Sequence, residues 1–135
     1  MGHVGTRLHT VVYRATGGRA LGQMGGQPVL LLETVGRRSG QRRVTPLQYM
    51  PREDAFVVVA SARGAPRPPA WYLNLRSRRR ARVRIGTQEV EVLMREARGG
   101  ERIRLWTELT AANHRLERAA RKAGRRLPVI VLERA

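Results

Sequence analysis

The stretch from Leu30 to Tyr49 constrains the fold more than any other part of the chain. Its sequence, LLLETVGRRSGQRRVTPLQY, places an apolar run before a turn bracketed by Gly36 and Gly40, and a second extended run after that turn. Two short extended runs joined by a tight glycine-containing turn predict a β-hairpin. Four arginines and the hydroxyl of Ser39 gather at one end of it, which predicts a site for a multiply charged anion.

The remaining elements are also short. The patterns predict strands at Pro28–Val35, Val44–Met50, Phe56–Ser61, Arg82–Ile85, Glu89–Val92 and Pro128–Leu132, and helices at Thr6–Thr16, Ala70–Arg76 and Glu101–Ala120. Residues 17–27, with five glycines, are expected to form a loose connector. Successive short strands joined by tight turns favour a mostly β (α+β) fold, a small barrel of mainly antiparallel strands with helices packed outside.

A proline in the second predicted strand and an apolar stripe along the long predicted helix add detail to this fold. Pro46 cannot donate a backbone hydrogen bond, so the second strand is expected to lie at an edge or to contain a bulge. The long helix carries apolar side chains at helical spacing, and Gly124 is expected to end its last turn. The members of that stripe are Ile103, Trp106, Leu109, Ala112 and Leu116.

Size and composition set outer bounds on fold and function. With 135 residues, we expect a single domain spanning 1–135 with one core, and the 41% hydrophobic content excludes a wholly disordered chain. We find no secretory signal pattern and no apolar run of the roughly 20 residues needed to span a bilayer. The chain has no cysteine, which excludes disulfides, thiolate metal sites and a cysteine nucleophile and favours the reducing cytoplasm. The three histidines have no metal-ligand spacing.

The charge predicts anionic partners. The formal net charge is +17, and 26 of the 27 basic residues are arginine, which grips phosphate and carboxylate through two hydrogen bonds. A phosphorylated or polycarboxylate cofactor, nucleic acid and an anionic membrane surface all fit, and the charge does not choose among them. Six arginines lie between Arg76 and Arg84. A solvated face is the default interpretation of that run, and binding of a phosphate backbone is the second.

No set of side chains in the sequence is able to perform chemistry alone. Taken by itself, the Gly36–Gly40 turn is more often a solvated hairpin turn than an anion site. Trp71 and Tyr72 point about 100° apart on a helix, so one can be core while the other lines a pocket. Glu33 lies in an apolar strand and is expected to pair with an arginine. If the chain is an enzyme, a cofactor must carry the reaction.

Four blocks in register resemble the deazaflavin-dependent nitroreductase family, part of the flavin/deazaflavin oxidoreductase group with a split β-barrel fold. The blocks are Leu31–Gly40, Arg43–Leu47, Val58–Ser61 and Pro69–Leu75. Their order and spacing match over residues 29–132. The resemblance implies coenzyme F420, whose tail carries a phosphate and several glutamates, with FMN as the less favoured cofactor. It also implies hydride transfer from the reduced deazaflavin to a small acceptor such as a quinone, an enone or a nitro compound.

The resemblance also implies where the cofactor binds. Arg37, Arg38, Ser39 and Arg43 would hold the phosphate and tail; Val44, Thr45, Pro46, Leu47 and Gln48 would line the ring; Ser61, Ala62 and Arg63, next to Ala60, would contact the phosphate or ring edge; and Ala70, Trp71, Tyr72, Leu73 and Asn74 would close the pocket. No catalytic side chain is implied. The protein would orient the two reactants and exclude water from them.

The chain departs from that family where the substrate is expected. The places that match the family's substrate-side tyrosines hold Gln48, Asn113, Leu116 and Ala119, and Ala62 stands where a basic residue is expected, with Arg63 one step on. Cofactor binding is therefore implied more strongly than nitroreductase activity. The alternatives are a nucleic-acid or anionic-membrane binder, with nucleic acid disfavoured, and a cofactor-binding protein without turnover. A homodimer and peripheral membrane contact are compatible with the sequence.

Overall fold

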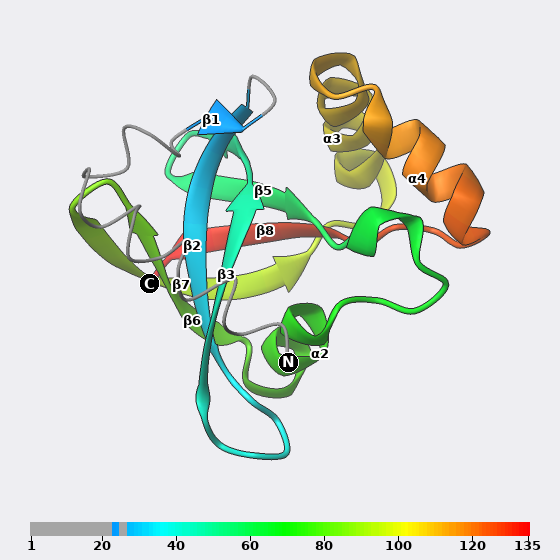
Figure 1. The fold of residues 1–135 in the computed structure, drawn as a ribbon. Coiled ribbons are helices and arrows are strands. Elements are labelled where there is room, and N and C mark those ends of the chain that lie inside the picture. The colour runs from blue at the N-terminus through cyan, green and yellow to red at the C-terminus, as the bar shows by residue number, and fades with distance from the viewer. Residues whose placement is uncertain (1–22, 25–26) are drawn as a thin grey trace.

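The computed structural model describes residues 23–24 and 27–135. The helix expected at residues 6–16 and most of the expected connector lie outside this part of the chain. The elements, drawn in Figure 1, are β1 (Gln23–Met24), β2 (Gln27–Val35), β3 (Arg42–Gln48), β4 (Met50–Arg52), β5 (Ala55–Val59), the 3-10 turn η1 (Ala62–Gly64), α2 (Ala70–Arg78), β6 (Arg80–Ile85), β7 (Gln88–Glu96), α3 (Gly99–Ala112), α4 (Arg115–Ala123) and β8 (Val129–Arg134).

The described strands form one curled antiparallel sheet. Its order is β1-β2-β6-β7-β8-β5-β4, with β3 paired to β2 beside this path. The chain crosses from β3 to β4 at Tyr49, and the two strands pair with different neighbours, β2 and β5. Pro46 lies opposite Leu31 in β3, which pairs only with β2 among the described strands, as expected for a strand containing proline. The predicted mostly β architecture is confirmed.

Alternation along the strands divides the core into two clusters, one on each face of the sheet. Leu30, Leu32, Phe56 and Ile130 belong to the inner cluster, together with the aromatic side chains of α2. Val57, Val129 and Val131 face the other way and pack with α3 and α4. Strands β5 and β8 are covered on both faces, which explains their nearly continuous apolar sequences. Helices α3 and α4 lie outside as predicted, whereas α2 packs on the inner face.

The prediction of one continuous helix at Glu101–Ala120 is wrong, because the chain forms two helices there, α3 and α4. Asn113 adopts an extended conformation, with φ −144° and ψ 96°, between α3 and α4. Its side-chain Oδ1 accepts the backbone N–H of Arg115 at 3.1 Å and so caps the first turn of α4. The break changes the helical phase. Within α3 itself the predicted stripe is also misplaced, because Leu105, absent from it, is buried, whereas Ile103 is 65% exposed.

Other differences concern element ends. The second strand begins at Arg42 and ends at Gln48, because β4 begins a new pairing with β5 after Tyr49. The third strand ends at Val59, and the chain turns into η1 immediately after Ser61. Both strands of the predicted second hairpin are confirmed and are longer than expected. Within the expected connector, Gln23–Met24 pairs with the start of β2.

Candidate functional site

The turn between β2 and β3 is tightly closed by its own backbone. Gly36 donates its N–H to Gln41 at 2.7 Å, and Gly40 donates to the Gly36 carbonyl at 2.9 Å. Gly40 has φ +71°, and a Cβ on Gly36 would lie 2.5 Å from the Ser39 hydroxyl oxygen. That oxygen accepts the N–H of Gln41 at 3.2 Å. The turn therefore requires both glycines and presents Arg37, Arg38 and Ser39 outward.

The arginines of this hairpin end differ in their partners. Arg42 forms an ion pair with Glu33 at 2.7 Å, which confirms the expected partner class for that carboxylate. Within the described part of the chain, Arg37, Arg38 and Arg43 have no carboxylate partner. The half-buried Arg43 lies at the base of the turn, with its Nε 3.8 Å from where a Gly36 Cβ would stand. This end of the hairpin thus carries uncompensated positive charge.

A buried amide on α2 holds the turn in place. Asn74, only 5% exposed, accepts the backbone N–H of Arg37 at 3.1 Å and its Nη1 at 3.5 Å, both through Oδ1. Its Nδ2 donates to Thr34 Oγ1 at 3.4 Å. Donor and acceptor of the Asn74 amide are therefore both satisfied by the hairpin. The family resemblance assigned α2 and the hairpin turn to one site, and these hydrogen bonds join the two segments.

The segment after β5 forms a second group of possible anion donors. Ser61 is right-handed, with φ −87° and ψ −32°, and is followed by Ala62 at φ 47° and Arg63 at φ 55°. A right-handed residue followed by a left-handed one turns successive N–H groups toward a common point, where anions bind. The N–H groups of Ala62 and Arg63 have no acceptor among the described residues. Positive φ at non-glycine residues is costly and concentrates at functional sites.

Helix α4 and the residues after it support this segment. Gly64 has φ +82°, and a Cβ there would lie 2.9 Å from Lys122 Cδ and 3.1 Å from the Ala119 carbonyl oxygen. Arg125 donates to the carbonyls of Ala65 at 3.1 Å and Arg67 at 3.2 Å. Sequence reasoning missed these supports, because nothing local marks a contact between residues about 60 positions apart.

Two residues noted as departures from the resembling family are brought together. Asn113 Nδ2 donates to Gln48 Oε1 at 3.4 Å, joining the end of β3 to the break between α3 and α4. The two other departures have structural contacts of their own. Leu116 is buried in the outer core cluster, and the carbonyl of Ala119 faces Gly64. Gln48 and Asn113 thus lie side by side where β3 ends.

Both aromatic side chains of α2 are buried in the inner core. Tyr72 donates its hydroxyl to a Glu96 carboxylate oxygen at 2.6 Å. Burial, reinforced by that bond and by the negative charge of Glu96, raises the pKa of Tyr72. Ala70 is exposed and Leu73 is half-buried, so their side chains remain accessible on the helix.

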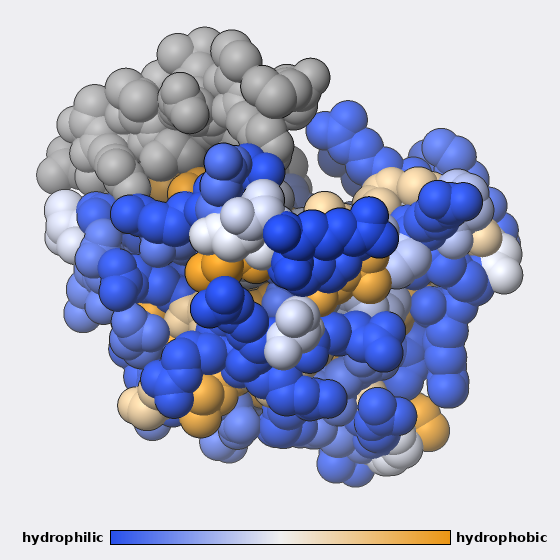
Figure 2. All heavy atoms as spheres, turned by 90° about the horizontal axis from the view of Figure 1, so that it is seen from below, coloured by the Kyte–Doolittle hydropathy of each residue, from blue (hydrophilic) through white to orange (hydrophobic). Residues whose placement is uncertain are grey.

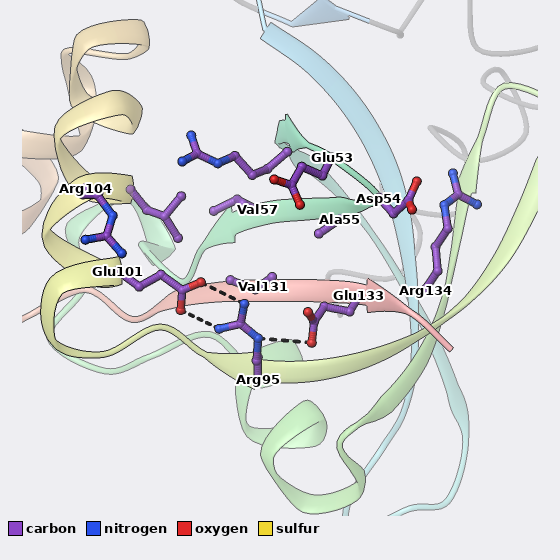
Figure 3. Close-up of a pocket in the computed structure, with 12 residues that line it drawn as sticks. Glu53, Asp54, Ala55, Val57, Arg95, Glu101, Arg104, Val131, Glu133 and Arg134 are labelled. Atoms are coloured by element: carbon purple, nitrogen blue, oxygen red, sulfur yellow. Dashed lines mark hydrogen bonds and ion pairs between the residues drawn. The ribbon is translucent and has the colours of Figure 1, made fainter.

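The hairpin end is an exposed, largely hydrophilic surface, as the view from below in Figure 2 shows. Two large hollows formed by the described residues lie elsewhere. One, of about 420 Å³, lies beside α3 and is lined by four arginines and four carboxylates. Figure 3 shows Arg95 at one edge of it, between Glu101, to which it is bonded at 2.8 Å, and Glu133, at 3.1 Å. The hairpin end therefore presents its unpaired positive charge on an open surface rather than in a deep hollow.

No group of three or more histidine, cysteine or carboxylate residues in the described part of the chain is arranged to hold a metal ion. None of the described helices is long and apolar enough to cross a membrane.

Comparison with known proteins gives a consistent set of relatives. The sequence model of the family described as F420H(2)-dependent quinone reductase matches residues 5–134. The F420H(2)-dependent quinone reductase Rv1261c of Mycobacterium tuberculosis (strain ATCC 25618 / H37Rv) is 35% identical over 139 aligned positions, covering 98% of this chain and 93% of that protein.

Two solved structures are similar over most of their length. One, described as an F420-H2 dependent reductase (FDR-A), has a TM-score of 0.71 and 30% identity, and the match covers 78% of this chain and 94% of that one. The other, described as a domain-swapped dimer, has a TM-score of 0.73 and 26% identity, with 96% of each chain covered.

Proposed function

The chain belongs to the F420H(2)-dependent quinone reductase family and is an oxidoreductase that uses coenzyme F420, and from this premise we propose which residues hold the cofactor and the acceptor. The resemblance to deazaflavin-dependent enzymes drawn from the sequence is confirmed, as is the split-barrel-like fold. A quinone-type acceptor fits this family.

The observation that carries the assignment is the unpaired charge at the hairpin end. Arg37, Arg38 and Arg43 lack carboxylate partners in the described part of the chain, whereas their neighbour Arg42 is neutralised by Glu33. Guanidinium groups bind phosphate and carboxylate through paired hydrogen bonds, and these are the groups that the F420 tail carries. We assign the phosphate and tail to these three arginines. The Ser39 hydroxyl, whose oxygen already accepts Gln41, can donate its proton there.

The segment after β5 would meet the cofactor through its backbone. The N–H groups of Ala62 and Arg63 suit a phosphate oxygen or a ring carbonyl. Ala60 is fully buried, so its part is limited to supporting Ser61. Strand β3, from Val44 to Gln48, is paired on one side only among the described strands and would offer its other backbone edge to the ring. In α2, the side chains of Ala70 and Leu73 are accessible, while Trp71, Tyr72 and Asn74 support them.

Reduced F420 supplies the hydride when it is bound. The protein's own contribution is to orient the two reactants in contact and to keep water from them. The described residues around the hairpin offer arginines, amides and backbone groups, which bind and position, and we assign no side chain as acid or base.

We place the acceptor at Gln48 and Asn113. One N–H of the Asn113 amide is used by Gln48, and its second has no acceptor among the described residues. An amide N–H is a suitable donor for a quinone carbonyl, whose oxygen gains negative charge as hydride arrives. The pair lies at the end of β3, the strand proposed to carry the ring. This places the acceptor beside the cofactor rather than beside the tail arginines.

Neighbouring arginines provide a matched test of cofactor binding. Arg42 and Arg43 are adjacent in β3, so their side chains leave opposite faces of the strand. We expect Arg43→Ala to weaken F420 binding by about 1.5–3 kcal/mol, the usual worth of a charge-assisted bond, and Arg42→Ala to change it little. Binding is followed by quenching of tryptophan fluorescence, with Trp71→Phe identifying the responsible tryptophan. Equal losses in the two arginine variants would contradict the assignment.

Nucleic-acid binding is not needed to explain the arginine run 76–84. Arg82 pairs with Glu91 at 3.0 Å, and Arg84 pairs with Glu89, so two of the three arginines of β6 have a carboxylate partner. A homodimer and a cytoplasmic location are part of the proposal, whereas peripheral membrane contact is not. The similar structure described as a domain-swapped dimer supports the proposed dimer. Gel filtration with light scattering at several protein concentrations tests it.

A further inference from the structure

A second large hollow, of about 430 Å³, lies at the C-terminal end of α2. Its wall contains Arg76, Arg79, Arg95 and Arg98, together with Tyr72 and Glu96. On a helix with about 100° per residue, Arg76 and Arg79 lie within about 40° of Tyr72, whereas Asn74 lies about 160° away. The face of α2 that borders this hollow is therefore not the face that holds the hairpin turn.

The hollow carries an excess of positive charge. Arg95 is already bonded to Glu101 and Glu133, and the carboxylate of Glu96 accepts the Tyr72 hydroxyl. Arg76, Arg79 and Arg98 have no carboxylate partner among the described residues. The hollow beside α3 differs in this respect, because its four arginines are matched by four carboxylates. Of these two hollows of the described residues, the one at α2 lacks matching negative charge.

The unpaired arginines are held in position by the fold. The guanidinium of Arg76 lies 5.7 Å from the centre of the Tyr72 ring, a cation–π distance, and the Glu96 bond fixes that ring. Arg79 ends α2 with φ 59° and donates its backbone N–H to the Leu75 carbonyl. Its own carbonyl accepts the N–H of Met94 at 2.9 Å. This left-handed position favours glycine, so an arginine there is strained. Strain of this kind is typical of residues whose side chains have a function.

We propose that this hollow is a second anion site, which binds a small molecule carrying two or more phosphate or carboxylate charges. Three forked guanidinium groups match such oxyanions. The volume exceeds what a single phosphate fills, and buried Met94 and the Tyr72 ring give part of the wall an apolar character suited to an organic body. The site gives two members of the 76–84 arginine run, Arg76 and Arg79, a role separate from binding of the F420 tail.

The test is a titration of the full chain, saturated with F420, with pyrophosphate and, in a parallel series, with citrate. Calorimetry should show one binding event beyond the cofactor, weakening as salt is raised. A preference for pyrophosphate or for citrate distinguishes phosphorylated from polycarboxylate ligands. No binding event with either anion would overturn the proposal.

Two substitutions remove the charge without endangering the fold. Arg79→Gly relieves the positive φ, and Arg98→Ser places a favoured capping residue before α3. Each should raise the Kd of the anion at least about tenfold, the factor equivalent to about 1.4 kcal/mol. Arg80→Ala, an exposed arginine of the same run outside the hollow, is the control and should bind as the unaltered chain does. Unchanged binding in Arg79→Gly and Arg98→Ser, or an equal loss in Arg80→Ala, would overturn the proposal.

Independence from the cofactor site is tested with Arg43→Ala. This variant should keep the second binding event, with or without F420 present, because its arginine is at the hairpin. Loss of the event in Arg43→Ala, with Arg79→Gly unaffected, would assign the anion to the hairpin and remove the second site. Since the titration also works without F420, its outcome is separable from that of the cofactor assignment.

Discussion

Asn74 Oδ1 accepts the backbone N–H of Arg37 at 3.1 Å, which joins a buried side chain of α2 to the turn that carries the unpaired arginines. The two residues are 37 positions apart, and the bond replaces water at a backbone donor that the turn itself leaves unused. Helix α2 thus borders the hairpin site on one face and the second hollow on the other. The turn at Arg37 and the arginines Arg76 and Arg79 all depend on this one short helix.

Replacing Asn74 should loosen the turn. In Asn74→Leu, which has nearly the same shape, the Arg37 N–H and the Thr34 hydroxyl lose their partners, which should cost about 1–3 kcal/mol of unfolding free energy. F420 binding should weaken as well, because the arginines are no longer held in position. Denaturant titration and tryptophan fluorescence measure the two effects. Thr34→Val removes only the weaker bond and should retain most of the F420 affinity, so an equal loss would show that the Arg37 bond is not decisive.

The amide pair of Gln48 and Asn113 should affect the acceptor more than the cofactor. Asn113→Ala should lower kcat/KM for a quinone about two- to tenfold, the worth of one neutral hydrogen bond, and leave the Kd of F420 nearly unchanged. Because Asn113 also caps α4, thermal unfolding must be measured alongside. Gln48→Ala leaves that cap intact and is the cleaner variant. A large rise in the Kd of F420 with unchanged acceptor kinetics would move these residues to the cofactor.

Tyr72 should ionise at a higher pH than an ordinary tyrosine side chain. Burial first, and then the bond to Glu96, raise its pKa above the ordinary value of about 10. The unfolded chain releases this proton before the folded one does. The stability that Tyr72 contributes is therefore complete below about pH 10 and is lost as the pH rises further. Absorbance of tyrosinate should show one late step, absent in Tyr72→Phe, and an unchanged titration in that variant would contradict the prediction.

Glu101 should make part of the stability sensitive to acid. Its hydrogen bond to Arg95, helped by the positive charge of that residue, lowers the pKa of Glu101 against the opposing effect of burial. A lowered pKa gives stability that is complete above the unfolded value of about 4.3 and is lost as the pH falls below it. Denaturant unfolding at successive pH values should show this loss, and Glu101→Gln should show a shallower one. Its half-exposed position makes the effect small.

Local chemistry explains which parts of this fold were predictable. The β2–β3 hairpin follows from Gly36 and Gly40, and the second hairpin from alternation and a Gly-Thr turn, so both are found in the sequence. The division of the long helix could not be predicted in this way, because Asn113 is a weak helix breaker within an apolar pattern. The bonds of Asn74 to Arg37 and of Asn113 to Gln48 join distant segments. Family resemblance gathered these residues into one site, whereas their geometry required the structure.

Gly64 tests whether the anion-binding backbone after β5 depends on α4. An alanine there must adopt φ +82° and place its Cβ 3.1 Å from the Ala119 carbonyl oxygen and 2.9 Å from Lys122 Cδ. The lysine side chain can move aside, but the carbonyl belongs to the helix backbone. Gly124→Ala is the matched control, since its φ of +64° imposes similar strain with nothing within 4 Å of the new Cβ.

Gly124→Ala should therefore cost about 1–2 kcal/mol of unfolding free energy, the left-handed penalty alone. Gly64→Ala should cost about 1–3 kcal/mol more, because it overpacks the contact with α4. The shift should also displace the N–H groups of Ala62 and Arg63 and weaken F420 binding, measured by the same fluorescence titration. If Gly64→Ala is no less stable than Gly124→Ala, the helix does not hold this segment. If its F420 affinity is unchanged, those N–H groups do not contact the cofactor.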